Sequence, residues 1–186
     1  MENVLVISVV VLWIVVLINL ALTMAIIRRL NTMNAMTPQP IDMLDIGTQA
    51  PAFNIETMDG QTVSDQDYAN REKIMVFVAP GCEPCSEQMP KLQEAYYDAQ
   101  KSGIELMVIS LDNAVATKQY AEQLLFTAPI LAASAGANPF VKEYKVSSTP
   151  SYYLIDSKNT IKEAGPLAPA WNNLVQKMQN KIHVPV

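Results

Sequence analysis

The segment from residue 74 to residue 85 reads Ile74-Met75-Val76-Phe77-Val78-Ala79-Pro80-Gly81-Cys82-Glu83-Pro84-Cys85. It opens with a continuous apolar run, which is typical of a strand buried on both faces of a sheet. Two cysteines follow at once, and the apolar spacing after them predicts a helix over residues 87–101. This order of strand, cysteine pair and helix is the structural context that a redox Cys-x-x-Cys motif requires.

The spacing of Cys82 and Cys85 suits reversible disulfide exchange. Two thiols at positions i and i+3, placed across the first turn of a helix, lie on one side and can close a small ring. If Cys82 begins the helix, unpaired backbone N–H groups and the helix dipole stabilise its thiolate. We therefore predict that Cys82 is the attacking thiol and that Cys85, which is more shielded, resolves the mixed disulfide.

Other roles for the cysteine pair remain open at this point. A zinc site needs about four ligands, and the only further ligand of the usual kind is His183, which is expected in an exposed tail. We predict neither a metal nor a cofactor. A peroxidase of the peroxiredoxin type would have Thr or Ser three residues before its reactive cysteine, where this chain has Ala79. A pair without a redox role is the remaining alternative.

The charge balance excludes one broad class of partner. The chain has 13 Lys and Arg residues against 18 Asp and Glu residues, which gives a formal net charge of −5. Nucleic-acid binding needs a basic face, so no nucleic acid is expected as a partner.

The N-terminal segment has the properties of a membrane anchor. Residues 4–27 include no charged side chain, and a helix of that length, at ~1.5 Å per residue, spans the roughly 30 Å hydrocarbon layer of a bilayer. A cleavable signal peptide would need a basic start, whereas Glu2 is acidic. We predict a transmembrane anchor at residues 1–30, a linker at residues 31–45 and one domain at residues 46–186.

The remaining pattern predicts an α/β domain. A hairpin is expected around the turn Asp59-Gly60, because alternating residues flank it. Further strands are expected over residues 104–111, 129–132, 152–155 and 160–163, and helices over residues 114–125, 139–144 and 171–182. Alternating strands and helices indicate a layered domain with a mostly parallel central sheet.

Three segments resemble the membrane-anchored TlpA/ResA-like thioredoxins. They are Ala79-Pro80-Gly81-Cys82-Glu83-Pro84-Cys85, Gly47-x-x-Ala50-Pro51-x-Phe53 before the hairpin, and Ser148-Thr149-Pro150. The resemblance implies a thioredoxin-like fold with an N-terminal β-hairpin, in which Thr149-Pro150 is a cis-proline loop that binds substrate. Gly81 departs from the family, which usually has an aromatic residue there.

The anchor, the pair Arg28-Arg29 and the linker look closest to the MauD proteins, which act in methylamine dehydrogenase maturation. The resemblance implies a membrane-anchored protein thiol-disulfide oxidoreductase that acts on the cysteines of an exported client during its maturation, with room for a membrane redox partner. It places the domain outside the cytoplasm, on a single-pass protein of the cell membrane. Arg28 and Arg29 argue the opposite orientation by the positive-inside rule.

Three other functions stay open. The domain can be a redox-inactive binding or assembly factor of thioredoxin-like fold, or a reductant of haem-binding thiols in cytochrome c maturation. A copper-delivery protein of similar fold is the weakest alternative, because the domain lacks a suitable histidine ligand.

Overall fold

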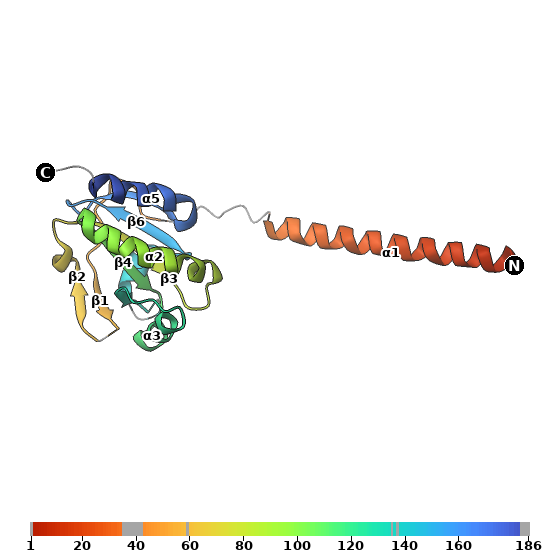
Figure 1. Ribbon diagram of the computed structural model, residues 1–186, viewed down its shortest axis with the longest axis horizontal. Coiled ribbons are helices and arrows are strands. Elements are labelled where there is room, and N and C mark those ends of the chain that lie inside the picture. The colour runs from red at the N-terminus through yellow and green to blue at the C-terminus, as the bar shows by residue number, and fades with distance from the viewer. Residues whose placement is uncertain (1, 35–42, 59, 135, 137, 183–186) are drawn as a thin grey trace. The chain divides into compact units, whose positions relative to one another are not determined.

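The computed structural model describes residues 2–34, 43–58, 60–134, 136 and 138–182 (Figure 1). The chain divides into two compact units, Met1–Pro40 and Ile41–Val186. The first unit contains helix α1 (Glu2–Asn34). The elements of the second unit are, in chain order, β1 (Asn54–Thr57), β2 (Thr62–Ser64), the 3₁₀ helix η1 (Asp65–Tyr68), β3 (Glu72–Val78), α2 (Glu83–Ser102), β4 (Ile104–Ser110), α3 (Ala114–Gln123), β5 (Ile130–Ala132), α4 (Pro139–Glu143), β6 (Ser151–Ile155), β7 (Ile161–Pro166) and α5 (Leu167–Ile182).

Helix α1 contains one stretch that is long and apolar enough to cross a membrane by length and composition. This stretch, Val6–Met24, has 19 residues and a mean hydropathy of 2.8. Its side chains are exposed along its whole length and none of them is charged, so its apolar surface goes all round the helix, as in a helix that lies in lipid. Helix α1 continues to Asn34, four residues into the segment predicted as a linker.

The second unit is built on one seven-stranded sheet with the strand order β2-β1-β5-β4-β3-β6-β7. Only β3–β4 and β4–β5 pair in parallel; the other neighbours are antiparallel. The prediction of a mostly parallel sheet is therefore wrong. A parallel pair needs a long crossover, and α2 and α3 supply one each, whereas hairpins join β1 to β2 and β6 to β7.

Strand β3 lies inside the sheet and is buried on both faces, as its apolar run predicts. Ile74, Val76 and Val78 belong to a core cluster that includes residues of α2, α3 and α5. Met75 and Phe77 belong to a second cluster with residues of α4. Figure 1 shows α2 and α5 lying across the same face of the sheet.

Two helices begin earlier than the sequence pattern predicts. Helix α2 begins at Glu83 rather than at residue 87, with Cys82 as its N-cap and Pro84 in its first turn. Pro is favoured in a first turn because its missing N–H has no partner to lose there. Helix α5 begins at Leu167, four residues before the predicted start at Trp171.

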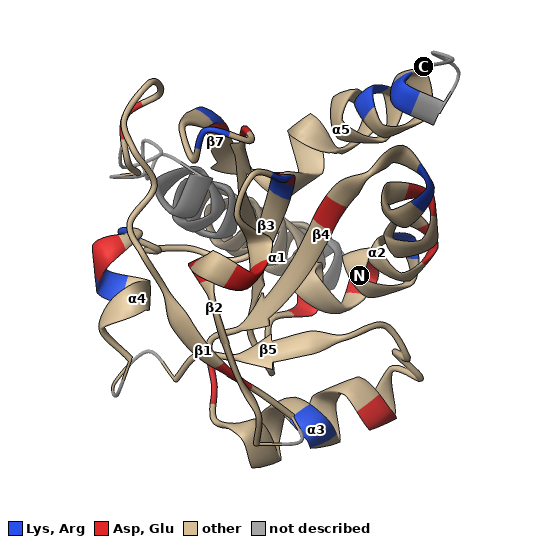
Figure 2. Ribbon diagram, turned by 90° about the vertical axis from the view of Figure 1, so that its left-hand side faces the viewer, with Lys and Arg blue, Asp and Glu red and all other residues tan. Residues whose placement is uncertain are grey.

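Charged residues are interspersed over the domain surface (Figure 2). Lys177 pairs with Glu163 of β7, and Lys181 pairs with Glu72 of β3, so both pairs join α5 to the sheet. Their partly exposed positions limit what each pair adds to stability, to about 1 kcal/mol or less.

An aromatic cluster fixes the segment that leads into the domain. Tyr153 of β6 is fully buried and contacts the ring of Tyr144 edge-on. Its hydroxyl donates to the carbonyl of Tyr144 at 2.6 Å and accepts from the backbone N–H of Leu44 at 3.0 Å. Gly47 N–H donates to the carbonyl of Ile161 at 2.8 Å. Residues 43–53, which lead into β1, are thus part of the folded domain.

Replacing Tyr153 with phenylalanine is expected to lower the free energy of unfolding by about 1–3 kcal/mol, because the Leu44 N–H and the Tyr144 carbonyl lose a buried partner. Urea denaturation followed by circular dichroism measures this change. Tyr97→Phe, at an exposed tyrosine of α2, is the control and should change stability by less than about 0.5 kcal/mol. An equal effect of the two variants would contradict the prediction.

Candidate redox site

A tight turn carries the chain from the end of β3 to the cysteine pair. The backbone N–H of Cys82 donates to the carbonyl of Ala79 at 3.2 Å and closes this turn. Gly81 has a φ of +77°, in the left-handed region that glycine adopts without the strain of a Cβ atom. This backbone conformation gives a physical reason for glycine where the resembling family has an aromatic residue.

Cys82 lies at the N-terminus of α2, the position that its predicted role as the attacking thiol requires. Its sulfur accepts a hydrogen bond from the backbone N–H of Cys85 at 3.2 Å, the position of an N-cap acceptor. Its carbonyl accepts from the N–H groups of Cys85 and Ser86, both at 3.1 Å. The N–H of Cys85 at the helix start is thus shared between the carbonyl and the sulfur of Cys82, and at the sulfur it favours a negative charge.

The two cysteines form a disulfide but differ in accessibility. Their sulfurs are 2.03 Å apart and their Cα atoms 5.2 Å apart. Cys85 is fully buried in the core under α2, whereas Cys82 is half-buried. The sulfur of Cys85 is therefore shielded from an approaching thiolate, whereas Cys82 is partly accessible.

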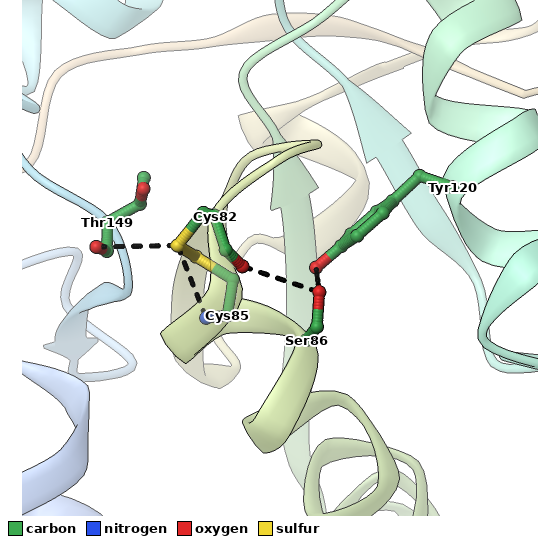
Figure 3. Close-up of a disulfide and its surroundings, with 5 residues drawn as sticks. All are labelled: Cys82, Cys85, Ser86, Tyr120 and Thr149. Carbon is green, nitrogen blue, oxygen red and sulfur yellow. Dashed lines mark hydrogen bonds between the residues drawn. A yellow bond between two sulfur atoms is a disulfide. The ribbon is translucent and has the colours of Figure 1, made fainter.

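The Thr149-Pro150 loop lies beside the disulfide because β6 pairs with β3. Phe77 is opposite Ser151 in this antiparallel pair, which brings the loop to the end of β3. The Thr149–Pro150 peptide bond is cis, as predicted. The carbonyl oxygen of Thr149 is 3.7 Å from the sulfur of Cys82 (Figure 3). In the disulfide this sulfur carries no proton, so the approach is a contact rather than a hydrogen bond.

The structure adds two hydroxyl groups that sequence reasoning missed. The Ser86 hydroxyl donates to the carbonyl of Cys82 at 3.3 Å, and the Tyr120 hydroxyl of α3 is 3.4 Å from Ser86 Oγ (Figure 3). Burial raises the pKa of Tyr120 above its ordinary value. The position of Ser86 one turn after Cys82 could have predicted its bond to the Cys82 carbonyl. No sequence pattern predicts that residue 120 contacts residue 86.

A buried amide lies next to the disulfide on the inner face of α2. Gln88 is 8% exposed, and its side-chain oxygen has no hydrogen-bond partner among the described residues. Residues three apart on a helix are neighbours, so this amide lies beside Cys85. Met89 and Leu92, which share the face, have no hydrogen-bond donor in their side chains. The oxidised site therefore leaves a buried acceptor unsatisfied.

Two further side chains could act with the cysteine pair: Glu83, which lies between the cysteines in the sequence, and His183 near the C-terminus. Glu83 is exposed, and His183 lies outside the described residues. Within the described ranges, no group of three or more His, Cys, Asp or Glu side chains could hold a metal ion. A cleft of about 750 Å³ opens between the hairpin, α3 and α4, and neither cysteine lines it.

Residues 46–164 match the model of the AhpC/TSA family. The chain is 32% identical over 126 residues to the thioredoxin-like protein YneN of Bacillus subtilis. The match covers 63% of this chain and 69% of YneN. It is 25% identical over 121 residues to the thiol-disulfide oxidoreductase ResA of Bacillus thuringiensis. This match covers 64% of this chain and 69% of that ResA.

Solved structures support the same fold. The thioredoxin domain of a thiol-disulfide oxidoreductase from Bacteroides vulgatus matches with a TM-score of 0.63 and 21% identity, covering 72% of this chain and 97% of that one. At this identity the likeness concerns the fold, and it confirms the thioredoxin-like architecture expected from the sequence.

Replacing Gln88 with methionine is expected to raise the free energy of unfolding of the oxidised protein by about 1 kcal/mol, because a buried acceptor without a partner is removed. Urea denaturation under oxidising conditions measures this. The matched control is Gln100→Met, at an exposed glutamine of the same helix, which should change stability by less than about 0.5 kcal/mol. A destabilised Gln88→Met protein would show that the amide has a partner.

Proposed function

Because the chain belongs to the AhpC/TSA family and is a thiol-disulfide oxidoreductase of the thioredoxin-like type, we propose that Cys82 and Cys85 are its catalytic pair. The observation that carries this assignment is the contrast between the two sulfurs. That of Cys82 is half-buried and accepts the Cys85 N–H at the start of α2, whereas that of Cys85 is fully buried.

The exchange proceeds through one mixed disulfide. In the oxidising direction, a client thiolate attacks the sulfur of Cys82, the Cys82–Cys85 bond breaks, and Cys85 leaves as a thiolate that takes a proton. A second client thiolate then attacks the client sulfur of the mixed disulfide and expels Cys82 as a thiolate. The client loses two electrons and the cysteine pair gains them; reduction of a client follows the same steps in reverse.

Thr149 and Pro150 form the proposed docking loop for the client. The Thr149 carbonyl lies 3.7 Å from the sulfur of Cys82, so a peptide that presents a cysteine to Cys82 passes directly over this loop. The Pro150 carbonyl accepts from the N–H of Leu167 at 3.0 Å, which ties the loop to the start of α5. The loop's role is to bind and orient the client backbone rather than to take part in bond exchange.

Cys85→Ser is expected to trap a mixed disulfide between Cys82 and the client, because the resolving thiol is absent. Cys82→Ser is expected to trap none, because the remaining thiol is buried. Non-reducing electrophoresis and mass spectrometry of the captured adducts measure both. Equal trapping by the two variants, or trapping by Cys82→Ser alone, contradicts the assignment.

We propose that the client is one exported protein whose cysteines are set during its maturation. The support is the resemblance of anchor and linker to the MauD proteins, which favours disulfide formation in a cysteine-rich subunit. The alternative direction is reduction of haem-binding thiols in a cytochrome precursor. Capture of many unrelated proteins by Cys85→Ser would contradict a dedicated client, and an absence of any adduct would favour the redox-inactive binding factor.

The N-terminal helix is the proposed membrane anchor, with the domain outside the cytoplasm. The stretch Val6–Met24 has the required length and hydropathy. A signal sequence has similar properties near an N-terminus, and Arg28-Arg29 favours the cytoplasmic orientation. Two charges are a small bias, and the TlpA/ResA-like resemblance outweighs them.

A periplasmic-type phosphatase fused after Val186 is expected to be active, and a reporter that works only in the cytoplasm is expected to be silent at the same position. The fusion should remain in the membrane fraction at full length, because the helix is not cleaved. The converse reporter pattern would reverse the orientation, and a shortened soluble fusion would identify a signal peptide.

A further inference from the structure

Helix α3 contributes one side chain to the redox site that has no role in the exchange steps. Tyr120 is 5% exposed, and its hydroxyl is 3.4 Å from Ser86 Oγ. Ser86 Oγ in turn is 3.3 Å from the carbonyl oxygen of Cys82. Figure 3 shows these groups in a row on one side of Cys82, with Thr149 on the other side.

The chemistry of these groups fixes the direction of both contacts. A backbone carbonyl oxygen can only accept, so the single hydroxyl proton of Ser86 is directed to the carbonyl of Cys82. The oxygen of Ser86 is then free to accept, and Tyr120 donates to it. The two hydroxyls thus form a chain that starts on α3 and ends on the N-cap residue of α2.

This chain acts on the peptide group between Cys82 and Glu83. The carbonyl of that group belongs to the first turn of α2, and the N–H of Cys85 in the same turn is 3.2 Å from the sulfur of Cys82. A shift of this turn would move the N–H away from the sulfur. The hydroxyl chain therefore holds the donor in the place where it stabilises a thiolate.

We propose that Ser86 and Tyr120 are positioning residues for Cys82, which they hold with the Cys85 N–H aimed at its sulfur. The inference rests on the proposed function, since it takes Cys82 as the attacking thiol. It adds a link between α3 and the reactivity of the cysteine pair.

A serine-to-carbonyl bond alone would not support this role. Such bonds are common within helices, and Ser102 at the other end of α2 makes one to the carbonyl of Ala99 at 2.8 Å. What distinguishes Ser86 is the buried hydroxyl from a different helix that donates to it. Ser102 therefore provides the matched control.

The test is the titration of Cys82 in the full-length chain in detergent micelles, in a Cys85→Ser background. The chain has only two cysteines, so the ultraviolet absorbance of the thiolate reports Cys82 alone. Tyr120→Phe and Ser86→Ala are each expected to raise the pKa of Cys82 by about half a unit. Alkylation by iodoacetamide below this pKa should slow by roughly threefold. The double variant should match Ser86→Ala, because Tyr120 acts only through Ser86.

The controls are Ser102→Ala and Tyr97→Phe, which should titrate as the parent does. Both test substitutions keep the bulk of each side chain, and thermal unfolding monitors the fold. An unchanged pKa in both variants contradicts the inference, as does an additive effect in the double variant. If the Cys85→Ser parent has a lowered Cys82 pKa and both test variants keep it, this inference alone is wrong. If the parent itself titrates at the ordinary thiol pKa of about 8.5, the proposed function is wrong as well.

Discussion

The redox site depends on the antiparallel pairing of β3 with β6. This pairing sets Phe77 opposite Ser151. The chain that leaves β3 toward Cys82 therefore lies beside the chain that enters β6 through Thr149-Pro150, at the same end of the two strands. A slip of one residue would turn every side chain of β6 to the opposite face. Because β3 is buried on both faces, the two cores resist such a slip and keep the loop beside the disulfide.

The chemistry of the cysteine pair follows from where α2 begins. With Cys82 as the N-cap, one sulfur lies at the helix start and the other lies one turn inside, against the core. The same geometry gives the two cysteines different electrostatic surroundings and different exposure. A pair in the middle of a helix would lack the electrostatic difference, since N–H groups there are already bonded to carbonyls.

The segment before β1 is fixed at the end of the sheet far from the cysteines. Gly47 bonds to Ile161, which is paired through Ile155 with the start of β3 at Lys73. The cysteine pair lies beyond the other end of this strand. The described residues that directly precede β1 are therefore fixed away from the end of β3 that carries the disulfide and the cis-proline loop.

The sequence by itself determined the buried strand before the cysteines, which is β3 (Glu72–Val78), and the cysteine pair beside a helix, because each depends on residues adjacent in the chain. The cis bond before Pro150 was expected from the resemblance to the TlpA/ResA-like thioredoxins. Only the tertiary structure decided the mixed strand directions, the placement of Tyr120 against Ser86 and the burial of the Gln88 side-chain oxygen without a partner among the described residues. These features depend on which elements pack together, and residues 34 positions apart leave no periodic signal for such a contact. Local patterns fix elements and reactive groups, whereas the arrangement of groups around a site is a property of the packed core.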